Sequence, residues 1–423
     1  MLKIFNQNKL LKVMSLNSIS VVISFVLGII STKIISIFLG SSGMALMGSF
    51  RNFSVMTKSI ATMGISNSIV KLFVENKNDK KELSIIYSTF FWILLVVSVL
   101  LTSLVLLFSE TISIFLFYSN SYKIPIQFFA LLLPLMVINT FWLAVFNGLE
   151  KFKSIVIMQI ISNVLIFFIT ALLIWKKNIV GGLLSISIGE LLLVIITFIF
   201  VLKDKEYFRF DLQKVVSSKY FNVIKRFILM ALLSAVIAPL TLILIRNTIV
   251  QNYSISEAGV WDAVNRLSSF YMLFFNTGLS LYYMPKLASL NTDDEFKTEL
   301  KSYFNTLVPL FLIMSVVIFF SKALIIRLVF SNEFSSISEL LIWQLAGDFI
   351  KVIVLAFGFQ IVVKTMLKKY FICEIIFNLS YFLLSLFLLK SIAVEGVLQA
   401  YFYANLITLV YILFAFRKLF YLK

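Results

Sequence analysis

Histidine is absent from this chain of 423 residues, and the only cysteine is Cys373. An internal disulfide needs two cysteines, and Cys/His metal sites and imidazole proton relays need side chains that the sequence does not supply. We therefore expect no metal and no cofactor, and any proton transfer has to use carboxylates. A GxxxxGK[ST] phosphate loop is also missing, which excludes an ATP-driven pump built from this chain alone.

Charge is scarce as well. Only 13% of the residues are charged, whereas 61% are hydrophobic. Soluble domains of ordinary composition contain about half apolar and a quarter charged residues. Long apolar runs such as FFWILLVVSVLLTSLVLLF recur along the chain, and 18 or more such residues cross a hydrocarbon core of about 30 Å as a helix. The composition predicts an all-α integral membrane protein.

Charged or Gly/Ser/Asn-rich breaks divide the chain into predicted membrane spans. Twelve spans are predicted, at residues 10–38, 44–73, 83–108, 122–148, 154–175, 179–202, 222–249, 257–285, 298–321, 336–363, 369–390 and 394–416. The basic N-terminus before the first span resembles a signal peptide, but the apolar stretch is too long and no small-residue cleavage site follows. We interpret it as an uncleaved span.

The distribution of basic residues predicts the orientation of these spans. Most of the 37 Lys and Arg residues lie in the N-terminus, the even-numbered connections and the C-terminus. Cytoplasmic loops carry the excess of Lys and Arg, so both termini are predicted to be cytoplasmic. The net charge of +17 is then mainly a topology signal, which argues against nucleic-acid binding, and membrane lipids with anionic headgroups are the expected partners of the basic loops.

The longest connection, KDKEYFRFDLQKVVSSKY, predicts two six-helix lobes, at residues 1–203 and 221–423, joined by a cytoplasmic linker at 204–220. An offset of 215 residues, chosen to place Arg51 on Arg266, brings all six spans of the two lobes into register. The same offset places Lys71 on Lys286, Lys153 on Lys368, Asn163 on Asn378, Gly181 on Gly396 and Lys203 on Lys418. These matches predict a parallel repeat about a pseudo-two-fold axis along the membrane normal, with the substrate path between the lobes.

Several ionisable side chains fall inside the predicted spans, where charges face protein or a wet cavity. The cations are Lys33, Arg51, Lys58, Arg266 and Lys351, and the anions are Glu190, Asp262, Asp348 and Glu374. Asp262 and Arg266 are four residues apart, and Asp348 and Lys351 three, so each pair shares a helix face and is able to neutralise itself. Glu190 and Glu374 fit equally well as protonated carboxyl groups held by hydrogen bonds between helices. Either interpretation leaves these residues as coupling or gating candidates.

The cations of the first lobe have no acid within four residues. Arg51 and Lys58 are seven residues apart and therefore lie on one helix face, while Lys33 lies near a helix end, from which its side chain is able to reach the interface. Glu190 is able to compensate one of them, which leaves an excess of positive charge. Because Arg binds phosphate through two parallel hydrogen bonds, this face predicts an anionic substrate in a wet cavity.

Four stretches carry a resemblance to a known family: KIISIFLGSSGMALMGSFRNF, FILMALLSAVIAPLTLILIRN, YSISEAGVWDAVNRLSSFY and SNEFSSISELLIWQLAGDFIKV. Here the chain resembles Wzx-type lipid-linked oligosaccharide flippases, a group that includes O-antigen translocases and the lipid III flippases of enterobacterial common antigen. The resemblance spans nearly the whole chain, and WQLAGDFIKV is its most specific part. Lys33, Arg51, Asp348, Lys351 and Glu374 match the family pattern, whereas Lys58, Glu190, Asp262 and Arg266 do not.

The resemblance implies two six-helix bundles in a V around a central cavity, as in the related drug and toxin extruders and lipid II flippases. It implies a bacterial inner-membrane protein that moves undecaprenyl-pyrophosphate-linked oligosaccharide to the periplasmic leaflet, with polysaccharide polymerase machinery as a further partner. The predicted substrate-binding residues are Lys33, Arg51, Lys58 and Arg266. Coupling to protons or sodium through Asp348 or Glu374 stays open.

Two other functions also stay open. A cation-coupled multidrug extruder predicts a site dominated by acids, whereas the buried charges here include more cations than anions. A membrane oligosaccharide polymerase or ligase needs catalytic carboxylates in a sizeable external loop, and the external loops carry little beyond SETISIFLFYSNSYK and FSNEFSSISE. We therefore predict a transporter rather than an enzyme.

Overall fold

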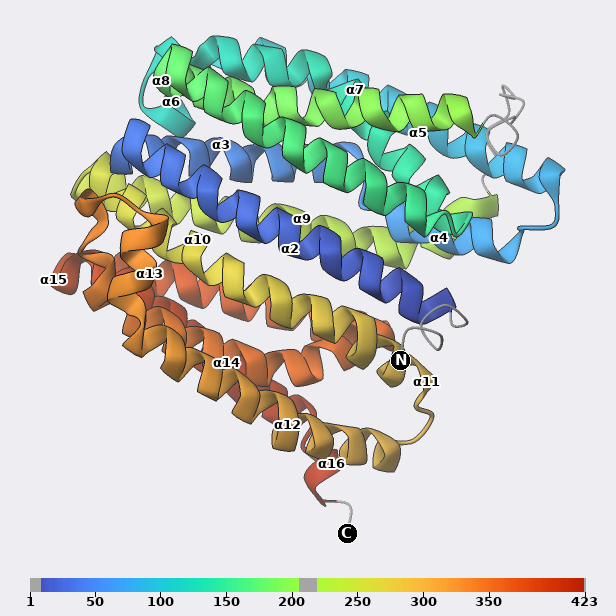
Figure 1. Cartoon of the computed structure of the whole chain (residues 1–423). Coiled ribbons are helices and arrows are strands. Elements are labelled where there is room, and N and C mark those ends of the chain that lie inside the picture. Colours follow the sequence, from blue (N-terminus) through green and yellow to red (C-terminus); the bar gives the residue numbers. More distant parts are fainter. Residues whose placement is uncertain (1–8, 205–218, 422–423) are drawn as a thin grey trace. The chain divides into compact units, whose positions relative to one another are not determined.

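The computed structural model describes residues 9–204 and 219–421. Every regular element within these two ranges is helical, and they contain no strand (Figure 1). The predicted linker at 204–220 falls almost entirely on residues 205–218, which lie outside the described residues. The all-α prediction is confirmed.

The chain folds into two compact units, residues 1–34 with 49–236 and residues 35–48 with 237–423. The helices wholly or mostly in unit 1 are α2 (Lys9–Phe38), α3 (Gly40–Ala61), α4 (Ser66–Glu75), α5 (Lys80–Leu107), α6 (Ser109–Phe117), η1 (Asn120–Tyr122), α7 (Lys123–Gly148) and α8 (Phe152–Lys203). Helix α7 packs against α4, α5 and α8. Its Phe129 lies 5.8 Å from Phe50, and these two fully buried rings form part of the core.

Helix α9 (Lys219–Asn252) continues from unit 1 into unit 2. The remaining elements of unit 2 are α10 (Ile255–Gly278), the π-helical turn η2 (Leu279–Tyr283), α11 (Met284–Ser289), α12 (Asp293–Phe320), α13 (Lys322–Val329), η3 (Asn332–Phe334), α14 (Ile337–Val363), α15 (Leu367–Ala415) and α16 (Lys418–Tyr421). Helix α14 is the centre of this unit and packs against α10, α12 and α15. The two units therefore share one order of elements.

Two very long helices, α8 and α15, each turn back on themselves. Asn178 in α8 has φ 47° and ψ −130°, and Ala393 in α15 has φ 52° and ψ −145°, values that no α-helix contains. After each reversal a glycine packs against the preceding helix: a Cβ on Gly181 would lie 1.9 Å from the Leu173 carbonyl oxygen, and one on Gly396 would lie 2.5 Å from that of Leu388. The sequence predicts separate spans on either side of both points, and this prediction is confirmed.

The reversals support the internal repeat. Asn178 and Ala393 are 215 residues apart, as are the two glycines and the two leucine carbonyls. A second pair with positive φ, Glu150 (57°) and Thr365 (49°), has the same spacing and precedes α8 and α15. The offset was chosen from residue types alone, yet it also matches residues of the same unusual backbone conformation in the two halves.

One predicted span is interrupted. The pattern predicts a continuous helix over 44–73, but α3 ends at Ala61 and α4 begins at Ser66, because Met63 and Gly64 adopt positive φ values of 51° and 59°. At the corresponding place in unit 2 the π-helical turn η2 follows α10. Two residues with left-handed backbone conformation end α3, whereas the π-turn η2 only widens the helix that follows α10.

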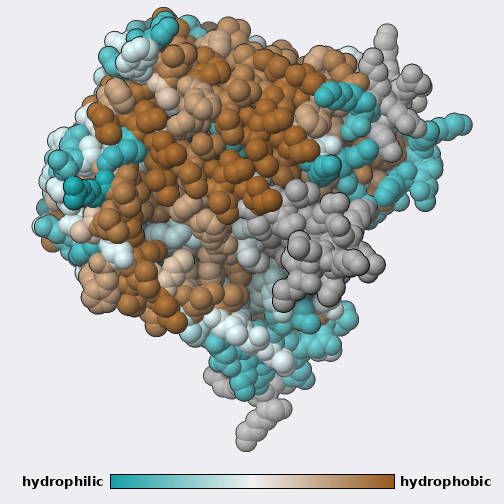
Figure 2. Space-filling view, in the orientation of Figure 1, coloured by the Kyte–Doolittle hydropathy of each residue, from teal (hydrophilic) through white to brown (hydrophobic). Residues whose placement is uncertain are grey.

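The surface of the helices is largely apolar, as expected for helices that contact lipid. Eight described helices are long and apolar enough to cross a membrane, and two of them, α8 and α15, contain a reversal. Apolar side chains cover much of the face in Figure 2, and Phe320, Leu107 and Phe387 are 82%, 74% and 73% exposed. Such exposure of large apolar side chains is typical of a lipid-facing surface. The chain is a multi-pass membrane protein, while the number of twelve spans stays a prediction.

Candidate functional site

The predicted substrate-binding cations of unit 1 lie on two successive helices. Lys33 is on α2, and Arg51 and Lys58 are on α3. All three residues are partly buried. Helix α3 contains no acidic residue. Charges on this helix consequently depend on partners from elsewhere in the chain.

Lys58 has such a partner. Its Nζ lies 2.8 Å from both carboxylate oxygens of Glu190, which the second segment of α8 carries, 132 residues away. The two side chains are 29% and 30% exposed. The sequence indicated that Glu190 is able to compensate one of the three cations, and the structure shows that this cation is Lys58, because α8 brings the carboxylate to it. Both members of the pair nevertheless remain accessible, so an incoming anion is able to compete with Glu190.

Asp262 forms an ion pair with a cation that the sequence analysis did not name, Arg246. Arg246 of α9 donates two hydrogen bonds to Asp262 of α10, from Nε at 2.6 Å and from Nη2 at 2.5 Å. The Arg246 side chain is only 3% exposed, and its guanidinium also lies 5.4 Å from the Trp261 ring. The Arg266 guanidinium lies 6.0 Å from the ring of Phe270.

Arg246 is the buried charge that sequence reasoning missed. It lies within the predicted span 222–249, three residues before its end, and was not among the predicted cations inside the spans. The signal that was available is the acid at position 262 on the next predicted helix. Removing one partner of such a buried pair is costly, because the other charge is then left without compensation.

Asp348 is fully buried and is held by neutral donors. Ser268 and Tyr271 of α10 donate to Oδ2 at 2.6 and 2.5 Å, Gln344 of α14 donates to the same atom at 3.2 Å, and Tyr401 of α15 donates to Oδ1 at 2.8 Å. Four hydrogen-bond donors thus converge on this one side chain. Asp348 therefore ties three helices together.

The sequence allowed Asp348 and Lys351 to neutralise each other, but these two side chains form no ion pair. Lys351 makes no ion pair with any described residue, and its Nζ lies 5.9 Å from the centroid of the Tyr401 ring. A spacing of three residues places two side chains on one helix face, but the choice of partner depends on the helices packed against that face. Here the hydroxyl groups of α10 and α15 surround the carboxylate.

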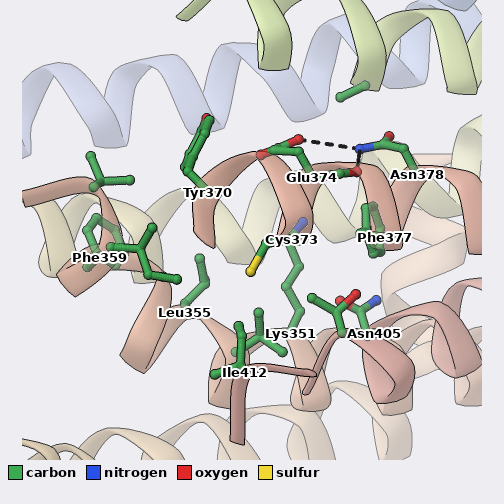
Figure 3. Close-up of a pocket in the computed structure, with 16 residues that line it drawn as sticks. Lys351, Leu355, Phe359, Tyr370, Cys373, Glu374, Phe377, Asn378, Asn405 and Ile412 are labelled. Atoms are coloured by element: carbon green, nitrogen blue, oxygen red, sulfur yellow. Dashed lines mark hydrogen bonds between the residues drawn. The ribbon is translucent and has the colours of Figure 1, made fainter. Parts of the chain in front are cut away.

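Lys351 instead lines a pocket together with Glu374. The pocket has a volume of about 400 Å³ and is bounded by α9, α14 and both segments of α15. In Figure 3 the Lys351 side chain extends from α14 towards the segment of α15 that carries Cys373 and Glu374. Asn378 donates a hydrogen bond to Glu374 Oε2 at 3.4 Å. The structure thus brings together two predicted residues that are 23 positions apart in the sequence.

Lipid-facing helices with reversals, an internal repeat and half-buried cations define a multi-pass membrane protein of the transporter class. The chain belongs to the family described as "Polysaccharide biosynthesis protein", which matches residues 10–291. Over 351 residues it is 24% identical to the lipid III flippase of Escherichia coli (strain K12). This alignment covers 82% of this chain and 84% of the flippase. The lipid III flippase of Shigella flexneri gives the same values. These relatives are named as flippases, which are transporters rather than enzymes.

Solved structures show the same fold at low sequence identity. The lipid II flippase MurJ in an inward closed conformation has a TM-score of 0.76 and 18% identity, covering 95% of this chain and 87% of that one. An inward-facing multidrug resistance MATE family transporter of the MOP superfamily has a TM-score of 0.74 and 13% identity, covering 93% and 95%. At these identities the likeness establishes the fold.

Proposed function

We propose that this protein is a flippase that moves undecaprenyl-pyrophosphate-linked oligosaccharide from the cytoplasmic to the periplasmic leaflet of the bacterial inner membrane. The observation that carries the proposal is the match to lipid III flippases over 82% of the chain. Those relatives are named for a lipid substrate, which distinguishes them from the multidrug transporters that share the fold. An O-antigen or similar repeat unit is the expected cargo.

The pyrophosphate is held by cations of α2 and α3. Lys33 and Arg51 are half-buried there, and the family match covers both positions. Two phosphate groups suit Arg, whose planar fork forms parallel hydrogen bonds to oxygen. Lys58 contributes only when the substrate displaces Glu190 from it, and Arg266 provides a further cation from α10.

Transport proceeds by alternating access. The oligosaccharide occupies a wet cavity, while the polyprenyl tail stays in the lipid, so only the polar headgroup has to cross. Cations in the cavity lower the cost of carrying the headgroup charge through the membrane. A negative cell interior also favours outward movement of an anion, by about 2.3 kcal/mol per charge per 100 mV. Release at the periplasmic leaflet delivers the unit to polymerase machinery.

The decisive test measures transport of a fluorescent undecaprenyl-pyrophosphate oligosaccharide in proteoliposomes. Arg51→Ala is expected to lower the initial rate by at least about tenfold, the effect of losing roughly 1.4 kcal/mol of binding. Arg51→Lys keeps the charge but loses the fork, so it restores part of the rate. Thermal unfolding of each reconstituted variant is measured first, so that transport rates are compared only between variants with the same folded fraction.

Lys71→Ala is the matched control. Lys71 lies on α4, more than half exposed, 3.7 Å from Glu75. Its loss is expected to leave transport unchanged. If Arg51→Ala transports normally while remaining folded, the cation is a structural residue and the binding assignment fails. If wild type moves a cationic dye but no lipid, the protein is a multidrug extruder instead.

A further inference from the structure

The connection between α2 and α3 belongs to a different unit from the cations on either side of it. Residues 35–48, here called the crossover segment, group with unit 2. Lys33 and Arg51, just before and just after this segment, lie in unit 1. The contacts that hold the crossover segment in unit 2 therefore fix the two chain ends from which these cations extend.

Two serines of the crossover segment are bound by residues around η3. Ser331 donates two hydrogen bonds to Ser36, from its N–H to Oγ at 3.1 Å and from its Oγ to the carbonyl oxygen at 3.0 Å. Glu333 accepts two from Ser41 through Oε1, one from the N–H at 3.2 Å and one from Oγ. Glu333 is the charged member of this contact, and hydrogen bonds to an ionised acceptor are the stronger kind.

Two glycines allow the backbones to approach this closely. Gly40 has a φ of 64°, and a Cβ on it would lie 2.8 Å from Glu333 Oε2. A Cβ on Gly259 of α10 would lie 1.8 Å from the Ser41 carbonyl oxygen. The Oγ atoms of Ser41 and Ser256, which are counterparts in the repeat, lie 2.5 Å apart. The start of α3 is thus packed directly against the start of α10 and against Glu333.

The repeat shows what the contact with Glu333 replaces. Helix α10 is the counterpart of α3 and caps its own start: Ser254 accepts from the N–H of Glu257 at 3.1 Å, and Glu257 places an acid in the first turn. The corresponding residues of α3 are Leu39 and Ser42. The Leu39 side chain has no hydrogen-bond acceptor, and the first turn of α3 contains no acid. Helix α3 therefore lacks the local cap that α10 has.

Glu333 supplies the missing cap from 292 residues away. The first N–H groups of a helix have no partner within it, and negative charge is favourable at that end. Ser41 is the second residue of α3, and its N–H binds the Glu333 carboxylate. The start of α3 consequently depends on a charge from unit 2, whereas the start of α10 depends on its own sequence.

We propose that Glu333 is a positioning residue for the lipid headgroup. As the cap of α3, it holds the crossover segment in place and so sets the positions of Lys33 and Arg51 relative to each other. Glu333 acts through α2 and α3 and does not itself bind the substrate. The proposal deepens the proposed function and rests on it for the identity of the ligand.

Glu333→Gln tests the cap with little change of shape, because the amide still accepts hydrogen bonds but carries no charge. The dissociation constant of the fluorescent undecaprenyl-pyrophosphate oligosaccharide is measured with the purified full chain in nanodiscs. We expect it to rise about twofold to fivefold, the range that corresponds to one charge at a helix end. Hydrogen exchange in the peptide that contains Ser41 should accelerate as well, because its N–H is held less firmly.

Ser42→Glu is the rescue variant. Ser42 is exposed and corresponds to Glu257, so a glutamate there gives α3 the acid that α10 has. Added to Glu333→Gln, it should restore most of the lost affinity, whereas Ser42→Gln should not. Glu339→Gln is the matched control, because Glu339 is an exposed acid in the first turn of α14. It should change neither the dissociation constant nor the exchange of the Ser41 peptide.

The outcomes separate this proposal from the flippase function. Equal dissociation constants for Glu333→Gln and wild type overturn the positioning role, and transport by wild type then leaves the proposed function intact. A loss of affinity that Ser42→Glu does not restore overturns it too, because charge at the start of α3 is then not the cause. If wild type binds the lipid but does not move it, the proposed function fails, while the variants still decide the role of Glu333. A wild type that does not bind the lipid contradicts both.

Discussion

Lys58 is a cation of unit 1 that is already paired with a carboxylate, that of Glu190. Both side chains are about 30% exposed, so the pair stands beside accessible space rather than in the sealed core. A phosphate that enters this space competes with the carboxylate for the same ammonium group. In the proposed function, this competition sets how tightly a headgroup binds at Lys58 and how readily it leaves.

Glu190→Gln is expected to tighten binding and to slow release. The amide leaves Lys58 without an anion, so the half-saturating lipid concentration should fall about threefold to tenfold, with a lower maximal rate. The measurement is lipid transport in proteoliposomes as a function of lipid concentration. Glu75→Gln, which alters the exposed pair with Lys71, should change neither value. An unchanged half-saturating concentration in Glu190→Gln would show that substrate does not contact Lys58.

At the scale of elements, the reversals in α8 and α15 are the features that give each unit its shape. A straight helix of 52 residues would be about 78 Å long, far more than a bilayer requires. The turn at Asn178 folds α8 into two segments, and Gly181 lets the second one approach the end of the first. Sequence reasoning found both reversals, because lysines and small residues interrupt the apolar runs there.

Gly181→Ala is expected to destabilise the protein by about 1–3 kcal/mol, as overpacking does. The new methyl group would lie 1.9 Å from the Leu173 carbonyl oxygen, so the turn has to open. Gly278→Ala is the matched control, because a Cβ there meets nothing within 4 Å. Thermal unfolding in detergent should show a clear loss for the first variant and none for the second. Equal melting temperatures would mean that the α8 turn adjusts without cost.

For the whole molecule, the distribution of positive charge predicts the topology. A parallel repeat implies that corresponding connections lie on the same side of the membrane. The connection α4–α5 corresponds to α11–α12, and α6–α7 corresponds to α13–α14. From the basic residues we predict that α4–α5 and α11–α12 lie in the cytoplasm and that α6–α7 and α13–α14 lie in the periplasm.

Single cysteines test this topology in a Cys373→Ser background. Asn120→Cys and Ser335→Cys, both at exposed positions 215 residues apart, should react with an impermeant maleimide in intact cells. Asn78→Cys and Asn291→Cys, also exposed, should react only after the inner membrane is permeabilised. If the members of a corresponding pair label on opposite sides, the parallel repeat is contradicted. If both pairs label on reversed sides, only the orientation is wrong.

The sequence by itself determined the helical membrane class, the reversals near residues 178 and 393, the repeat of 215 residues and the resemblance to lipid-linked oligosaccharide flippases. These follow from hydropathy, periodicity and residue type, which act along the chain. Only the tertiary structure decided the partners of the charges. Asp262 binds Arg246 from 16 residues away, Lys58 binds Glu190 from 132 residues away, and Asp348 is held by hydroxyl groups rather than by Lys351. Spacing along one helix identifies neighbours on that helix, but partners from other helices depend on how those helices rotate and pack.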